Sequence, residues 1–179
     1  MEKLNGQPRD VAISDSNIVF LVCGTSVCMY KESQGVLITH PLEYEPTSIA
    51  VSPQGTQVAI GGKDNKTHIY SVDGTALTIL RVLEQRDAVA RVTYSPDGRF
   101  FASADNMKNI VCYQLPNYEP ISRDMWRYHA ATITGLAFSP DGSKLASVAI
   151  DTHLMIYQPE NITKVVQVKG KKSIEFIQI

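Results

Sequence analysis

A tetrapeptide of one shape occurs three times in this chain, and its spacing restricts the fold more than any other feature. The copies are Ser52-Pro53-Gln54-Gly55, Ser95-Pro96-Asp97-Gly98 and Ser139-Pro140-Asp141-Gly142, and successive serines are 43 and 44 positions apart. A tyrosine follows each serine by 18 residues, at Tyr70, Tyr113 and Tyr157. Proline presets φ and glycine supplies a left-handed position, so each copy predicts a tight turn. The fixed period predicts repeated units that cover one another's faces.

Short apolar segments flank every copy of the turn, and they predict strands. In the clearest repeat the expected strands are residues 48–51, 57–60, 67–72 and 77–80, with Asp73-Gly74 as a hairpin signal before the last. The chain shows no helical period, so the fold class is all-β. Four strands in a unit of about 40–45 residues is typical of a propeller blade. We therefore predict a β-propeller with about four four-stranded blades.

The repeats follow one another along the chain, and no linker or change in composition marks a second domain. We expect a single partial propeller over residues 1–179, with repeats at about 9–43, 44–87, 88–128 and 129–172. The first repeat has lost the Ser-Pro-Xaa-Gly turn. Residues 173–179 would begin a further blade after a basic loop. Because an array that does not close leaves strand edges bare, we expect the chain to be a fragment of a longer protein.

Charge and composition limit the classes of partner that we expect. The formal net charge of −1 gives no general attraction to nucleic acid or acidic membranes. Apolar runs fall short of the roughly 18–20 residues that span a bilayer. Cys23, Cys28 and Cys112 lie in or beside strand-like runs, so we expect buried, reduced thiols and a cytoplasmic location. The expected partners are proteins, without nucleic acid, membrane or a small-molecule substrate.

The fourth repeat carries a set of polar residues that resembles the WD40 repeat. His129 precedes the first strand, Ser147 lies in the second, Asp151 lies in the following turn, and Tyr157 follows six residues later. The resemblance implies a buried hydrogen-bonded relay, and a buried imidazole is well satisfied by a carboxylate and a hydroxyl. Tyr128 stands where the family has glycine, and Tyr157 where it usually has tryptophan.

The other repeats depart further from this pattern. The second keeps Asp64 six residues before Tyr70, but Ile60 replaces the strand hydroxyl. It also has no histidine near Tyr44-Glu45-Pro46. The third has Ser103, but Met107 takes the position of the aspartate. We therefore expect most of the relay only in the fourth repeat.

A closer resemblance is to the second propeller of the actin-interacting protein 1 family. It rests on Tyr44-Glu45-Pro46, Val58-Ala59-Ile60-Gly61-Gly62, Tyr70-Ser71-Val72, His129-Ala130 and the opening segment 3–8, and covers about residues 3–168. The resemblance implies four blades of a seven-bladed propeller in a non-enzymatic scaffold of the actin cytoskeleton. That scaffold would bind actin filaments and assist cofilin in their disassembly. A generic WD40 adaptor in another multiprotein complex is the alternative.

Other residue patterns point to chemistry only weakly. The Ser-Pro-Asp-Gly serines recur on successive blades, whereas a nucleophile needs one converged site, so we expect no enzyme activity and no cofactor. His68 and His153 lie in different blades and do not predict a metal site. The segment before His129 holds Trp126, Arg127 and Tyr128, residue types that anchor interfaces, and we consider them for partner contact. The alternative is that the tryptophan packs under a neighbouring blade.

Overall fold

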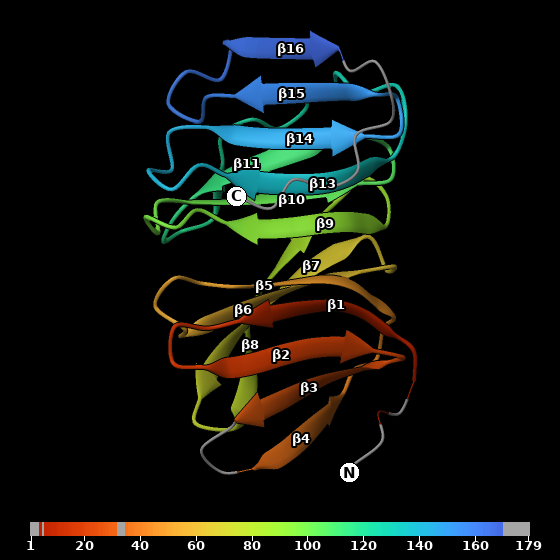
Figure 1. Ribbon diagram of the computed structural model, residues 1–179, viewed down its shortest axis with the longest axis vertical. Coiled ribbons are helices and arrows are strands. Elements are labelled where there is room, and N and C mark those ends of the chain that lie inside the picture. Colours follow the sequence, from red (N-terminus) through yellow and green to blue (C-terminus); the bar gives the residue numbers. More distant parts are fainter. Residues whose placement is uncertain (1–3, 5, 32–34, 170–179) are drawn as a thin grey trace. The chain divides into compact units, whose positions relative to one another are not determined.

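The computed structural model describes residues 4, 6–31 and 35–169, and in these residues the chain is all-β (Figure 1). Four antiparallel sheets of four strands each follow one another along the sequence. The predicted fold class is therefore confirmed. The chain divides into two compact units, Met1–Val89 and Ala90–Ile179, each with two sheets. The predicted start of a further blade at 173–179 lies outside the described residues.

The first unit contains two up-and-down sheets. The first sheet consists of β1 (Pro8–Ile13), β2 (Ile18–Cys23), β3 (Ser26–Lys31) and β4 (Val36–Pro41). The second consists of β5 (Pro46–Val51), β6 (Gln57–Gly62), β7 (Lys66–Asp73) and β8 (Ala76–Glu84). In each sheet the strands pair in sequence order, as short turns between neighbours require.

Apolar side chains of both sheets form the core of the first unit. Phe20, Val22 and Val27 of the first sheet join Val58 and Ile60 of the second, and all five are fully buried. A polar contact also links the two sheets: the Asp10 carboxylate accepts hydrogen bonds from the Ser48 hydroxyl at 2.7 Å and the Ile49 amide at 3.0 Å.

The second unit repeats this arrangement. Its strands are β9 (Val89–Tyr94), β10 (Phe100–Asp105), β11 (Ile110–Gln114), β12 (Glu119–Pro120), β13 (Ile133–Phe138), β14 (Leu145–Ala149), β15 (His153–Tyr157) and β16 (Val165–Lys169). One core includes Phe100, Ile110 and Trp126 together with Leu145 and Tyr157. The strands β9 and β13 are also joined by a hydrogen bond from Arg91 Nε to the Thr134 carbonyl at 2.9 Å.

The third sheet has an unusually short outer strand, because β12 pairs with β11 through only two residues. The loop after β12 continues along the same edge of β11. Ser122 Oγ accepts a hydrogen bond from the Cys112 amide at 2.8 Å, and the Ile121 amide donates to the Cys112 carbonyl at 2.8 Å. The Ile110 amide donates to the Trp126 carbonyl at 3.0 Å. Backbone groups of β11 are thus satisfied by a loop where a strand would otherwise lie.

The Ser-Pro-Xaa-Gly segments form turns of one design, as predicted. In each, the glycine amide donates to the serine carbonyl, at 2.8 Å for Gly55, 3.0 Å for Gly98 and 2.9 Å for Gly142. All three glycines have positive φ, between 68° and 72°. The three cysteines are buried free thiols, which agrees with the prediction made from their positions.

Candidate functional site

The serine hydroxyls of the repeated turns form hydrogen bonds with the backbone. Each hydroxyl accepts a hydrogen bond from the amide five residues later, at 3.0 Å for Ser52, 2.8 Å for Ser95 and 3.0 Å for Ser139. The bond spans the turn and fixes the start of the next strand. The same geometry in three repeats supports a structural use of these hydroxyls rather than one activated nucleophile.

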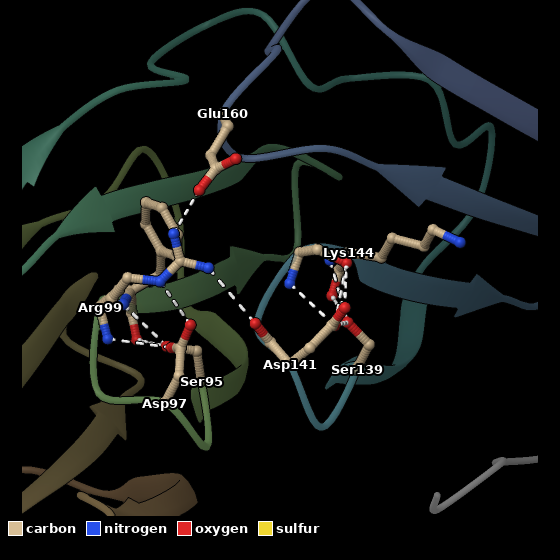
Figure 2. Close-up of polar contacts among 9 residues, drawn as sticks. Ser95, Asp97, Arg99, Ser139, Asp141, Lys144 and Glu160 are labelled. Atoms are coloured by element: carbon tan, nitrogen blue, oxygen red, sulfur yellow. Dashed lines mark hydrogen bonds and ion pairs between the residues drawn. The ribbon is translucent and has the colours of Figure 1, made fainter.

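The turns of the third and fourth sheets are joined through Arg99 (Figure 2). Its guanidinium donates to the Asp97 carboxylate at 2.5 Å, to the Asp141 carbonyl at 3.3 Å, and to the Glu160 carboxylate. The third sheet is thereby tied to the loop before β16 as well as to the Asp141 turn. These groups are at the surface, so each ion pair contributes little by itself and the arrangement serves mainly to orient the turns.

The structure brings the four predicted relay residues together. His129 Nδ1 lies 3.0 Å from Asp151 Oδ2, and His129 Nε2 lies 2.7 Å from Ser147 Oγ. The Ser147 and Tyr157 hydroxyl oxygens are 3.3 Å apart. The His129 side chain is fully buried and the Asp151 side chain is 7% exposed. The chain of polar contacts therefore runs from a turn into the core of the second unit.

The relay changes the acidity of its members. Burial acts to raise the pKa of Asp151, but hydrogen bonds from the Ala130 and His153 amides and from the His129 ring outweigh it and lower the pKa. Burial raises the pKa of Tyr157 to about 12. Near neutral pH the relay therefore combines a carboxylate with a protonated phenol, which suits a fixed hydrogen-bond network.

Trp126, Arg127 and Tyr128 have different environments. The indole of Trp126 is fully buried, stacks on Tyr157 with 4.6 Å between ring centroids, and donates from Nε1 to the Ile162 carbonyl at 2.9 Å. The indole is therefore not an exposed partner anchor, and the alternative of a packed tryptophan holds: the ring packs between β15 and the loop before β16. Arg127 is exposed and Tyr128 is 51% exposed. These two side chains stay predicted contact residues.

The second sheet has a polar arrangement that the sequence reasoning did not identify. His68 of β7 lies 2.9 Å from Asp64 through Nε2, and its ring stacks on Tyr44 with 3.8 Å between centroids. The hydroxyl oxygens of Tyr44 and Tyr70 are 3.0 Å apart. Asp64 occupies the position in its repeat that Asp151 occupies in the fourth. A histidine four residues after this aspartate, on the next strand, was the sequence feature that could have indicated the contact.

The described residues contain no group of three or more histidine, cysteine, aspartate or glutamate side chains that could hold a metal ion. In the same part of the chain, no helix has the length and apolar character needed to cross a membrane.

Comparison with known proteins identifies the repeats and several relatives. The family model described as "WD domain, G-beta repeat" matches residues 31–71 and 122–158. Actin-interacting protein 1 of Drosophila melanogaster is 35% identical over 163 residues, which cover 90% of this chain and 27% of that protein. The 66 kDa stress protein of Physarum polycephalum is 32% identical over 94% of this chain and 28% of its own length. Actin-interacting protein 1-2 of Arabidopsis thaliana is 36% identical over 87% of this chain and 26% of its own length.

The chain therefore spans roughly a quarter of the length of these relatives. Among solved structures, a chain in the crystal structure of mitotic checkpoint complex is similar with a TM-score of 0.75 and 19% identity. The similarity covers 88% of this chain and 49% of that one, and at this identity it bears on the fold alone. The matches show that the chain carries WD40 repeats in a propeller-like fold, and that most of its length is similar to one part of actin-interacting protein 1.

Proposed function

We propose that this chain is part of a non-enzymatic WD40 scaffold that binds actin filaments and, within a longer protein, assists cofilin in filament disassembly. The observation that carries the proposal is the similarity to proteins named actin-interacting protein 1. It reaches 35% identity in the Drosophila relative and extends over 90% of this chain. Such a role places the protein in the cytoplasm with the actin cytoskeleton.

The geometry supports a scaffold because its polar groups serve to fix loops. The turn serines bond backbone amides, and Arg99 joins turns of two sheets. Loops held on a rigid framework of sheets suit the recognition of a large protein partner without chemistry. Arg127 and Tyr128 are exposed beside the buried Trp126, which makes them the first residues to test for contact.

Co-sedimentation with filamentous actin tests the proposal, with and without cofilin. We expect the 179-residue chain to bind weakly, and a longer protein that also contains the preceding propeller of the family to bind more tightly. Joining two sites on one molecule can raise avidity by roughly 10²–10⁴. Microscopy of filament severing with cofilin present would then separate binding from disassembly.

The outcomes distinguish the proposal from its alternative. Loss of sedimentation in the longer protein on Arg127→Ala and Tyr128→Ala, with unchanged stability, would assign the contact to this segment. Absence of sedimentation for both the chain and the longer protein would contradict the actin proposal. A generic WD40 adaptor role in another complex would then be the better account.

A further inference from the structure

A pocket of about 350 Å³ lies in the first unit, outside the relay and the repeated turns. Its lining includes residues 40–44, from the end of β4 and the connection to β5. It also includes His68 and Tyr70 of β7 and Leu77 and Ile79 of β8. The volume is at the lower end of the range of about 300–1,000 Å³ for ligand pockets, so it fits one side chain with part of its backbone.

Aromatic rings form a fixed wall of this pocket. The Tyr44 and His68 rings are parallel within 9°, at 3.8 Å between centroids. The Tyr44 hydroxyl oxygen lies 3.0 Å from that of Tyr70, and His68 is held by Asp64. Each ring thus has a partner that limits its rotation, and the pocket presents a largely preformed surface.

The charge at the pocket is negative. Glu43 is exposed at the lining, and the Asp64 carboxylate lies 2.9 Å from His68 Nε2. Among the described residues that line the pocket there is no lysine or arginine. The pKa of Tyr70 is raised, first by burial and then by the negative charges of Asp64 and Glu43, while the hydrogen bond with Tyr44 acts in the opposite direction. The field of both carboxylates therefore reaches the aromatic wall.

His68 adds a polar atom without a partner. The residue is 8% exposed, and its Nδ1 atom is buried with no hydrogen-bond partner in the part of the chain that the structure describes. Because a carboxylate can only accept, the hydrogen bond to Asp64 places a proton on Nε2.

We propose that this pocket binds an arginine side chain of a partner protein. A guanidinium is planar, stacks on aromatic rings and is less strongly hydrated than an ammonium group, so an aromatic wall with a nearby carboxylate favours arginine over lysine. Its methylene groups would lie against Leu77 and Ile79, and Glu43 would face its charge. The inference does not depend on actin as the partner, because it rests only on the chemistry of the pocket.

Titration of the full chain with short peptides, followed by ¹H–¹⁵N NMR, tests the proposal. The probe is a seven-residue glycine–serine peptide with one central arginine, and the matched control carries citrulline, which has nearly the same shape without the charge. We expect the arginine peptide to bind about fivefold more tightly than the citrulline peptide, a ratio in the range of cation–π and charge effects at a partly exposed site. The amide shifts should be largest around His68 and Tyr70.

Three variants test whether the peptides bind in this pocket. Glu43→Gln should reduce the preference for arginine over citrulline, and Ile79→Trp should fill the pocket and abolish binding of both peptides. Leu80→Trp is the matched control: Leu80 lies on the same strand, is 54% exposed against 51% for Ile79, and does not line the pocket. It should leave binding unchanged.

Equal binding of the arginine and citrulline peptides would overturn the proposal, and so would binding that survives Ile79→Trp. Failure of the arginine peptide to bind at millimolar concentration would overturn it as well. Tighter binding of an otherwise identical peptide with central leucine would show that the pocket recognises apolar side chains instead. None of these results bears on sedimentation with actin, so the two proposals can fail separately.

Discussion

The carboxylate of Asp97 lies directly against Gly142, in the corresponding turn of the next repeat. A Cβ atom built on Gly142 would be 2.1 Å from Asp97 Oδ2 and 2.4 Å from its Cγ. Asp97 is also held in place, because its carboxylate accepts hydrogen bonds from the Ser95 hydroxyl and the Arg99 amide. The glycine of one repeated turn is therefore needed for the fit of the turn before it as well as for its own φ of 68°.

Gly142→Ala should lower the free energy of unfolding, because the new methyl group displaces Asp97 and the residue keeps an unfavourable φ. A non-glycine residue in this region costs about 1–3 kcal/mol before any steric term. Gly74→Ala is the control, with a φ of 61° and no atom within 4 Å of its added Cβ. Urea denaturation should show the larger loss for Gly142→Ala, and equal losses would contradict a role for the Asp97 contact.

Asp151→Ala should destabilise the protein by about 1–3 kcal/mol, because it removes the acceptor of a buried histidine and of two backbone amides. Asp64→Ala changes the equivalent turn position of the second sheet, where the side chain is 30% exposed against 7% for Asp151. We expect a smaller loss there. Denaturation midpoints of both variants test the structural role, and an unchanged midpoint for Asp151→Ala would refute it.

Stability should fall at acidic pH in part because of Asp141. Hydrogen bonds from the Ser139 hydroxyl and from the Ser143 hydroxyl and amide lower its pKa to about 2, whereas an aspartate in the unfolded chain titrates near 3.9. A carboxyl group with a lower pKa in the folded state stabilises it fully above about pH 4 and loses this effect as the pH falls toward 2. Between pH 4 and pH 2, unfolding free energies should decline less steeply for Asp141→Asn than for the parent chain. Parallel declines would show that this carboxylate does not contribute.

Trp126→Ala should mainly lower the free energy of unfolding. The indole is fully buried against Tyr157, and its Nε1 donates a hydrogen bond to the Ile162 carbonyl. Truncation of a buried tryptophan costs about 3–5 kcal/mol. Tyr128→Ala should change stability little, since that side chain is half exposed. Thermal unfolding of the two variants would show the contrast, and a small effect of Trp126→Ala would revive a role in partner contact.

The repeated turns were accessible from the sequence because they depend on local spacing, and the relay was accessible through its resemblance to the WD40 repeat. Serine, proline and glycine define their turn within four residues, and Asp151 and Tyr157 occupy the same repeat. The sequence offered both burial and partner contact for Trp126 and could not decide between them. Its burial depends on the loop that holds Ile162, 36 residues later, and no repeat-level pattern fixes the path of that loop.

The aromatic wall of the second sheet was also beyond the reach of sequence patterns. His68 and Asp64 lie four residues apart around a turn, which gave a local signal. Tyr44, however, comes from the segment between two sheets, and its stacking on His68 requires the packing of that segment against β7. Contacts of this kind arise from tertiary structure and produce no periodic pattern in the sequence.

The loop that follows β12 determines how the third sheet can meet other polypeptides. An exposed strand edge is a template on which a foreign strand can pair and begin aggregation. Along β11, the amides of Ile110 and Cys112 already donate to Trp126 and Ser122. An incoming strand would first have to displace this loop and its buried indole. The irregular loop therefore protects this sheet from unwanted self-association. A regular fourth strand would instead expose its own edge to other chains.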